Sequence, residues 1–228
     1  MTSSTFVDLR INNAEQLKES VSEPNPNTKI FLTFGKVDAW PNESSPNVSN
    51  SSMATIYEVW SNMIGGKRIL GGDMRHVIPR FNWTNNTSYS EYDTLIDSRD
   101  LKNANTSFYV LTDEFNVYKC ISNNYGSAST SKPVSTNPTG QFQTSDKYIW
   151  KYMYTLSAEE KLRFLTSSFM PVKTIPYSDG STQWEVQSHA IKGAIHVIQV
   201  TDGGSNYYSN DVSVIISGDG KDANAYAI

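Results

Sequence analysis

The chain has 228 residues, of which 38% are hydrophobic and 12% aromatic, enough for one large domain with a packed core. Its formal net charge of −4 and the lack of a dense Lys or Arg run argue against nucleic acid as a partner, and no apolar run is long enough to cross a bilayer. Only 18% of the residues are charged, so Asn and Ser must supply much of the polar surface. These residues favour turns, and aromatic residues favour strands. The composition therefore predicts short strands joined by polar loops.

The cysteine content and the N-terminus indicate the compartment. Cys120 is the only cysteine, so it cannot form an intrachain disulfide, and we expect it to be a small core residue of a strand at 117–121. The N-terminus has neither a basic start nor an apolar stretch, so it shows no secretory signal. We therefore expect folding in a reducing cytoplasm.

The first predicted elements are a short helix and a strand. Asn13 precedes residues 14–21, where apolar side chains recur on one helical face, and Pro24 prevents the helix from continuing. Residues 28–35 alternate apolar and polar side chains, which predicts a half-buried strand. Its apolar face would comprise Ile30, Leu32 and Phe34.

A polar loop and a second helix are predicted next. Residues 41–52 contain five serines and two prolines but little to bury, so we expect this loop to become ordered only when a neighbour covers it. A helix should run over 53–64, because Thr55 and Glu58 have the spacing of a capping box and Gly65-Gly66 can end it.

The middle of the chain reads as strands. Residues 89–97 are interpreted as a strand, and 107–112 and 115–121 as a hairpin that turns at Asp113-Glu114. Residues 123–144 contain prolines and glycines and are predicted to be a polar loop.

The clearest strand covers 147–156, because large apolar side chains alternate along it with Lys151 and Thr155. One buried face would comprise Tyr148, Trp150, Tyr152, Tyr154 and Leu156. Ser157 and Glu160 then form a capping box for a helix that extends to about 166, with Leu162 and Leu165 facing inward.

The last residues differ in pattern. Strands are predicted at 194–201 and 212–217, separated by a Gly-rich turn, and a further strand begins at 223. We therefore predict two domains. Residues 1–190 would form a core domain, and residues 191–228 would form the start of a Gly-rich β module that continues beyond them.

No catalytic constellation can be assembled from the sequence. His76, His189 and His196 are too scattered for a metal site or a triad, and Gly65-Gly66-Lys67 lacks the spacing of a phosphate-binding loop. Acidic residues could pair as in a glycosidase, but spacing alone does not support this. These pairs would be Asp93 with Asp97, or Asp113 with Glu114. We expect no enzymatic activity, cofactor, metal or small-molecule substrate.

The segment Val77-Ile-Pro-Arg80, followed by Trp83, has two interpretations. The Arg80 guanidinium could stack on the Trp83 indole and clamp a loop inside the fold. Alternatively, the two side chains could form part of a partner-binding hot spot, where Trp and Arg are enriched.

Three motifs in this order carry a family resemblance. They are Phe31-Leu-Thr-Phe34-Gly35 with Trp40, then Val77-Ile-Pro-Arg80 with Trp83, then Tyr148-Ile-Trp150-Lys-Tyr152-Met-Tyr154. Together they resemble the baseplate wedge subunit called gene product eight of T-even-like contractile-tailed phages. The run from Leu111 to Cys120 is similar in particular to the longer marine-phage versions. The chain departs from the T-even pattern after about residue 190.

The resemblance implies a mainly β (α+β) fold, with a β-sandwich-type core and about three short inserted helices. It also implies a virion protein of the tail baseplate that is made in the host cytoplasm, forms a homodimer, packs against other wedge subunits and has no catalytic role. Our interface candidates are Trp40, Arg80 and Trp83. Two alternatives stay open: a receptor- or glycan-binding tail protein, and a peripheral tail hydrolase.

Overall fold

A computed structural model shows two compact units, Met1–Arg75 and His76–Ile228, which we describe separately. It describes residues 4–23, 29–94 without 47 and 49, 96, 106–191 without 176, and 193–225 without 199, 201–203, 207, 209–211, 219 and 224. The domain boundary predicted after residue 190 falls inside the second unit, and it stays a prediction.

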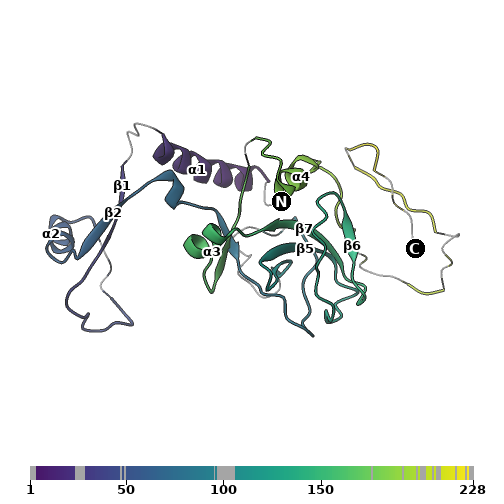
Figure 1. Cartoon of the computed structure of the whole chain (residues 1–228), viewed down its shortest axis with the longest axis horizontal. Helices are drawn as coiled ribbons and strands as arrows, with labels where there is room; N and C mark the ends of the chain where they lie inside the picture. The colour runs from purple at the N-terminus through teal and green to yellow at the C-terminus, as the bar shows by residue number, and fades with distance from the viewer. Residues whose placement is uncertain are drawn as a thin grey trace. The chain divides into compact units, whose positions relative to one another are not determined.

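The first unit combines two helices with a two-stranded antiparallel sheet, β1–β2, in which Ile30 lies opposite Ile69 (Figure 1). Its elements are α1 (Ser4–Ser22), β1 (Ile30–Phe34), α2 (Met53–Ser61), β2 (Gly65–Ile69) and a single 3-10 turn at Gly71–Asp73. The predicted strand and second helix are thus present.

The predicted start of α2 at Met53 is confirmed, but the start of α1, the cap of α2 and the end of α2 were predicted wrongly. Helix α1 begins at Ser4 and not after Asn13, because no Gly or Pro precedes Asn13 to interrupt it. Helix α2 is capped by Ser52, whose Oγ accepts from the Thr55 backbone N–H, so Thr55 lies inside the helix. The helix already ends before Gly65 and Gly66, which instead begin β2.

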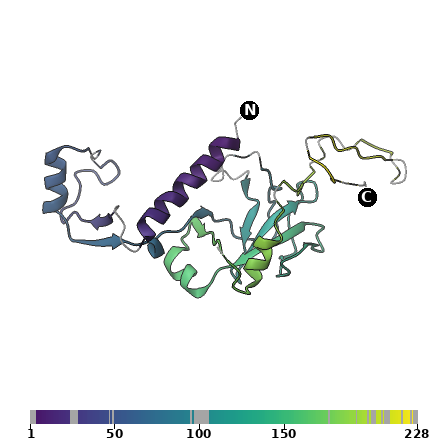
Figure 2. The ribbon, with the colours of Figure 1, turned by 90° about the horizontal axis from the view of Figure 1, so that it is seen from above.

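The second unit is built on a four-stranded antiparallel sheet with the order β4-β5-β7-β6, accompanied by the two-stranded sheet β3–β8. Its strands are β3 (Val77–Pro79), β4 (Tyr109–Leu111), β5 (Asn116–Ser122), β6 (Gln141–Gln143), β7 (Ile149–Thr155) and β8 (Phe169–Pro171), and its helices are α3 (Ala158–Phe164) and α4 (Thr182–Ser188). Helix α4 packs on β7 through its buried Val186 (Figures 1 and 2). The predicted mainly β (α+β) class is confirmed.

The alternating side chains of β7 form the centre of the core, as predicted. All five residues predicted for the buried face are at most 6% exposed: Tyr148, Trp150, Tyr152, Tyr154 and Leu156. The Trp150 indole stacks on the Tyr148 ring, with centroids 5.4 Å apart, and meets the edge of the Tyr89 ring. Cys120 is buried in the same cluster, as expected.

A second cluster joins the small sheet to the large one. Met170 of β8 and Ile78 of β3 pack with Leu111, Val117 and Tyr154 of the four-stranded sheet. The predicted hairpin of β4 and β5 is confirmed, with Tyr109 opposite Lys119.

Several predictions for this unit are wrong. The described residues of 89–97 are not a strand, because Tyr89 enters the core and Tyr92 makes one backbone bond to the Cys120 carbonyl. The predicted loop at 123–144 contains β6, whose register is set by Phe142 lying opposite Trp150. The capping box of Ser157 and Glu160 is present.

Two further differences concern the helices. Leu162 points to solvent and not inward, whereas Glu160 is buried because its carboxylate accepts the Ser157 backbone N–H. Helix α4 was not predicted, and its cap is Ser181, whose Oγ accepts from the Trp184 backbone N–H. None of the helices within the described residues is both long and apolar enough to cross a membrane.

The predicted C-terminal strands are absent from the described residues of 193–225. The isoleucines and valines of 195–200 and 212–216 are exposed apart from the half-buried Val197, and within the described part no neighbouring strand lies beside them. β-propensity alone does not make a strand, because each strand needs a partner for its backbone groups.

The polar loop before β7 is held by Asp146. Its Oδ2 accepts from the Thr130 and Ser131 backbone N–H groups at 2.8 and 2.9 Å and from Ser129 Oγ at 2.9 Å. Burial acts to raise the pKa of Asp146, but the hydrogen bonds, the largest from Thr144, outweigh it and hold the pKa below the usual range. The ionised carboxylate therefore ties the loop to the start of β7.

We predict that Trp150→Ala lowers the free energy of unfolding by about 3–5 kcal/mol, as other large-to-small core changes do. Trp150→Phe should cost less, because it keeps a ring in the stack and removes an indole N–H that has no acceptor among the described residues. Urea unfolding measures both changes. A cost below about 1 kcal/mol for Trp150→Ala would contradict a central position of this side chain.

We also predict that Asp146→Asn destabilises the fold at neutral pH by about 1–3 kcal/mol. The reason is that the NH2 group of the amide would face N–H and O–H donors that now bond to a carboxylate oxygen. Since the folded pKa of Asp146 lies below its unfolded value, its stabilisation is present above pH of about 4 and is lost as pH falls through the folded pKa. The variant should therefore lose less stability than the wild type on acidification. Asp38→Asn, at an exposed position, is the control and should leave both quantities unchanged.

Candidate protein-interaction surface

The first unit has almost no buried side chains. Among its described side chains, those of residues 9–75 outside the gaps, only Val21 is buried. A two-stranded sheet is marginal by itself in water unless further strands or a helix cover one of its faces. Within the described residues, most of the large apolar side chains of β1 and α2 are exposed.

Strand β1 illustrates the point. The sequence predicts a half-buried strand, but Leu32 and Phe34 are 61% and 62% exposed, and only Ile30 of the expected apolar face is half-buried. Phe31, on the opposite face, is exposed as well. Both faces of the strand thus offer aromatic or aliphatic surface, which is typical of protein contacts.

Helix α2 presents an apolar stripe. Met53, Tyr57 and Trp60 follow helical spacing on one side of the helix and are 67%, 73% and 70% exposed. An amphipathic helix normally buries such a stripe against another element. We call the exposed apolar side chains of β1 and α2 the β1–α2 surface, defined by Phe31, Leu32, Phe34, Met53, Tyr57 and Trp60.

The geometry of this surface depends on a close approach between the two elements. The Ile64 N–H donates to the Phe34 carbonyl at 2.9 Å, which brings the end of β1 to the end of α2. A side chain at Gly35 would begin 2.0 Å from the Asn62 carbonyl oxygen, so only glycine fits there. This requirement explains the glycine at the end of the Phe31–Gly35 motif.

Trp40 lines a cavity of 600 Å³ between β1, α2 and the loop that joins them. Its ring is half-buried and receives the Lys36 ammonium 4.1 Å from its centroid, and its backbone N–H donates to Glu43. Trp40 is therefore held in place beside the β1–α2 surface by its own loop.

Arg80 and Trp83 belong to the second unit and bond within it. The Arg80 guanidinium donates to Asn82 Oδ1 and to the Thr166 carbonyl, both at 2.8 Å, and not to the face of Trp83 as the stacking hypothesis requires. Trp83 packs against the core cluster and donates its indole N–H to Ser129 Oγ. Both side chains thus clamp the segment after β3, with partners that the sequence did not indicate.

Several acidic and histidine residues weighed for catalysis have other partners where the structure describes them. Asp113 and Glu114 both pair with Lys132 at the hairpin turn, and Asp97 lies outside the described residues. The His189 ring donates from Nδ1 to the Glu185 carbonyl at the end of α4. Within the described part of the chain, no three His, Cys, Asp or Glu residues gather as metal ligands would.

One titratable contact was not predicted. Lys119 of β5 is buried, and its amine donates to Nδ1 of His196 at 3.0 Å. Burial and the charge of Lys151 lower the pKa of Lys119 to about 8, and burial, Lys119 and Lys151 lower the pKa of His196. The sequence feature that could have indicated this contact is a lysine inside an apolar run, with Tyr118 before it and Cys120 after it.

Comparison with known proteins completes these observations. A family model described as bacteriophage T4 Gp8 matches residues 3–124, which is more than half of the chain. The baseplate wedge protein gp8 of Enterobacteria phage T4 is 22% identical over 184 residues, covering 66% of this chain and 54% of that protein. The chain thus spans about half the length of this relative. The chain therefore belongs to the bacteriophage T4 Gp8 family, with a match that runs from α1 to the end of the hairpin of β4 and β5.

Proposed function

We propose that this protein is a structural subunit of a phage tail baseplate wedge and that it acts by protein–protein assembly without catalysis. The observation that carries the proposal is the uncovered β1–α2 surface in a chain of the Gp8 family. A unit whose apolar side chains have no core of their own gains stability when another protein covers them.

Two kinds of partner follow from this proposal. One is a second copy of the chain, giving a homodimer, and the other is a set of different wedge subunits in the virion. Low charge density favours such contacts, because removing ions from water is the main penalty in burying a polar surface. An obligate interface should bury more than about 2,000 Å² in total.

Of the interface candidates, Trp40 is the best placed, because its cavity adjoins the β1–α2 surface. Arg80 and Trp83 also stay candidates, since both are half-exposed, but each already has a partner inside the second unit. A partner would therefore meet their outer edges only.

We predict that Trp60→Glu weakens self-association or incorporation into the baseplate by about 30-fold, the effect of losing a hot spot of about 2 kcal/mol. Analytical ultracentrifugation measures the first contact, and co-assembly with the other wedge proteins measures the second. Leu162→Glu is the matched control, since Leu162 is a more exposed apolar residue on α3 and should change neither. A wild-type protein that is strictly monomeric and absent from purified tails would refute the proposal.

We predict that the loop at 41–52 is cleaved in the free protein and protected in the assembly. All its described residues are exposed, and Val48, its one aliphatic side chain, is 92% exposed. A Glu-specific protease should cut after Glu43 and release residues 1–43, which mass spectrometry detects. Glu43→Gln removes the cut and serves as control. Equal cleavage in free and assembled protein would show that no neighbour covers this loop.

A further inference from the structure

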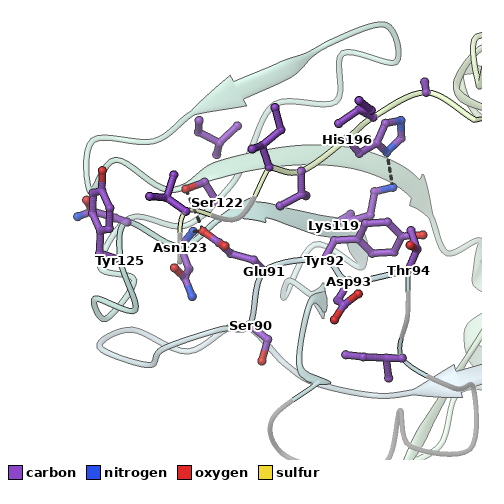
Figure 3. A pocket seen from close by; sticks show the side chains of 18 of the residues that line it. Ser90, Glu91, Tyr92, Asp93, Thr94, Lys119, Ser122, Asn123, Tyr125 and His196 are labelled. Atoms are coloured by element: carbon purple, nitrogen blue, oxygen red, sulfur yellow. Dashed lines mark hydrogen bonds between the residues drawn. The ribbon is translucent and has the colours of Figure 1, made fainter. Parts of the chain in front are cut away.

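A second cavity, of 1620 Å³, lies within the second unit (Figure 3). One wall comes from residues 90–96, β5 and the turn after it, and the other from the segment at 191–200. Figure 3 shows the Lys119 amine directed at His196, with the Tyr92 ring beside it. The bond between Lys119 and His196 is the hydrogen bond that joins the described residues of 193–200 to the sheet. The backbone hydrogen bonds of these residues stay within their own segment.

The register of the sheet brings two lysines together on this side. Lys119 of β5 lies directly opposite Lys151 of β7. Like charges in directly opposed positions destabilise a sheet unless an opposite charge lies near them. After burial, the charge of Lys151 contributes to the lowered pKa values of both Lys119 and His196.

The contacts of the Lys119 amine are uncharged. The side chain is only 5% exposed, its Nζ donates to neutral His196, and it lies 4.1 Å from the centroid of the Tyr92 ring. An ammonium has three donors, and a buried one is normally paired with a carboxylate. With its pKa at about 8, Lys119 is still mostly protonated at neutral pH and needs such a partner.

The acids of the cavity do not meet this need. Glu91 Oε1 accepts from Ser122 Oγ at 3.2 Å and from the Asn123 N–H at 3.1 Å. The Asp93 carboxylate lies on the far side of the Tyr92 ring from the amine (Figure 3), and burial together with the charge of Asp93 raises the pKa of Tyr92. Within the described part of the chain, neither carboxylate bonds to Lys119.

The cavity that holds the amine has polar and apolar walls. Ile149 of β7 lines it from the sheet, and Ile195 and Ile198 line it from the opposite wall with more than half of their surface exposed. A ligand that reaches from the amine to these isoleucines must carry an apolar group beside its charge, since isoleucines do not replace the water around a bare ion. We propose that this cavity binds a carboxylate joined to an apolar group, with its oxygens at the Lys119 amine and within the field of Lys151.

Two sources could supply this ligand: a free small carboxylate, or an acidic side chain next to apolar residues of a neighbouring protein. Both present the same chemistry to Lys119. The site is inferred from the sheet register and the cavity of the second unit, so it does not depend on the proposed assembly role.

His196 provides a direct readout. Burial and then the two lysines lower its pKa, so an anion bound at Lys119 must raise it. The chain has three histidines, so imidazole NMR signals can be resolved and the His196 signal assigned with His196→Asn. His76 and His189 are internal controls.

The experiment titrates the histidines of the full chain in sodium chloride and in sodium butyrate at equal ionic strength. We expect butyrate to raise the pKa of His196 by about half a unit or more and to leave the other two unchanged. In Lys119→Met, the pKa of His196 should already be higher in chloride and should no longer respond to butyrate. Equal shifts of all three histidines, or an unchanged response in Lys119→Met, would overturn the site.

A second arm distinguishes the sources. A short peptide with blocked ends and the sequence Leu-Glu-Leu is compared with its Leu-Gln-Leu counterpart in the same titration. Binding of the Glu peptide at least about tenfold tighter than butyrate identifies a protein side chain as the ligand. Weaker binding than butyrate identifies a free carboxylate. No response to either ligand in the unmodified protein contradicts the proposal, whether or not the variants fold.

Discussion

One buried face of β7 organises the second unit. Its aromatic side chains fill the space between the sheet and α4, and the neighbouring segments attach to them. The Tyr148 hydroxyl donates to the Ser127 carbonyl and accepts from the Tyr89 backbone N–H, so two loops depend on this one side chain. Asp146, just before the strand, holds the rest of the polar loop. The long connections of this unit are thus fixed at the start of β7.

The same strand explains the lysine pair. Because successive side chains point to opposite faces, a strand that buries Trp150 and Tyr152 must turn Lys151 to the other side. Pairing with β5 then places Lys119 opposite it, with Tyr118 and Cys120 in the core. Burying one face with aromatic residues therefore concentrates positive charge on the other, where the segment at 191–200 lies against Lys119 through His196.

The sequence predicts the structure correctly where a single local interaction decides it. The alternation of 148–156 and the Ser157–Glu160 capping box are of this kind. Tertiary partners decided the rest: β6 forms because Phe142 meets β7, and the C-terminal strands do not form because the described residues offer no partner. The interface candidates rest on residue type alone and stay predictions, and residue type does not indicate the partners of Arg80. Lys119 was missed because its importance arises from register across strands.

The two units differ in how their apolar residues are used. The second satisfies its aromatic side chains internally, whereas the β1–α2 surface of the first does not. If a partner covers that surface, the free energy of binding also stabilises the unit, because burial on assembly adds apolar contacts that the described residues of the unit lack. Stability and assembly are then coupled, because covering Trp60, Phe34 and Leu32 together stabilises the unit more than covering any one of them.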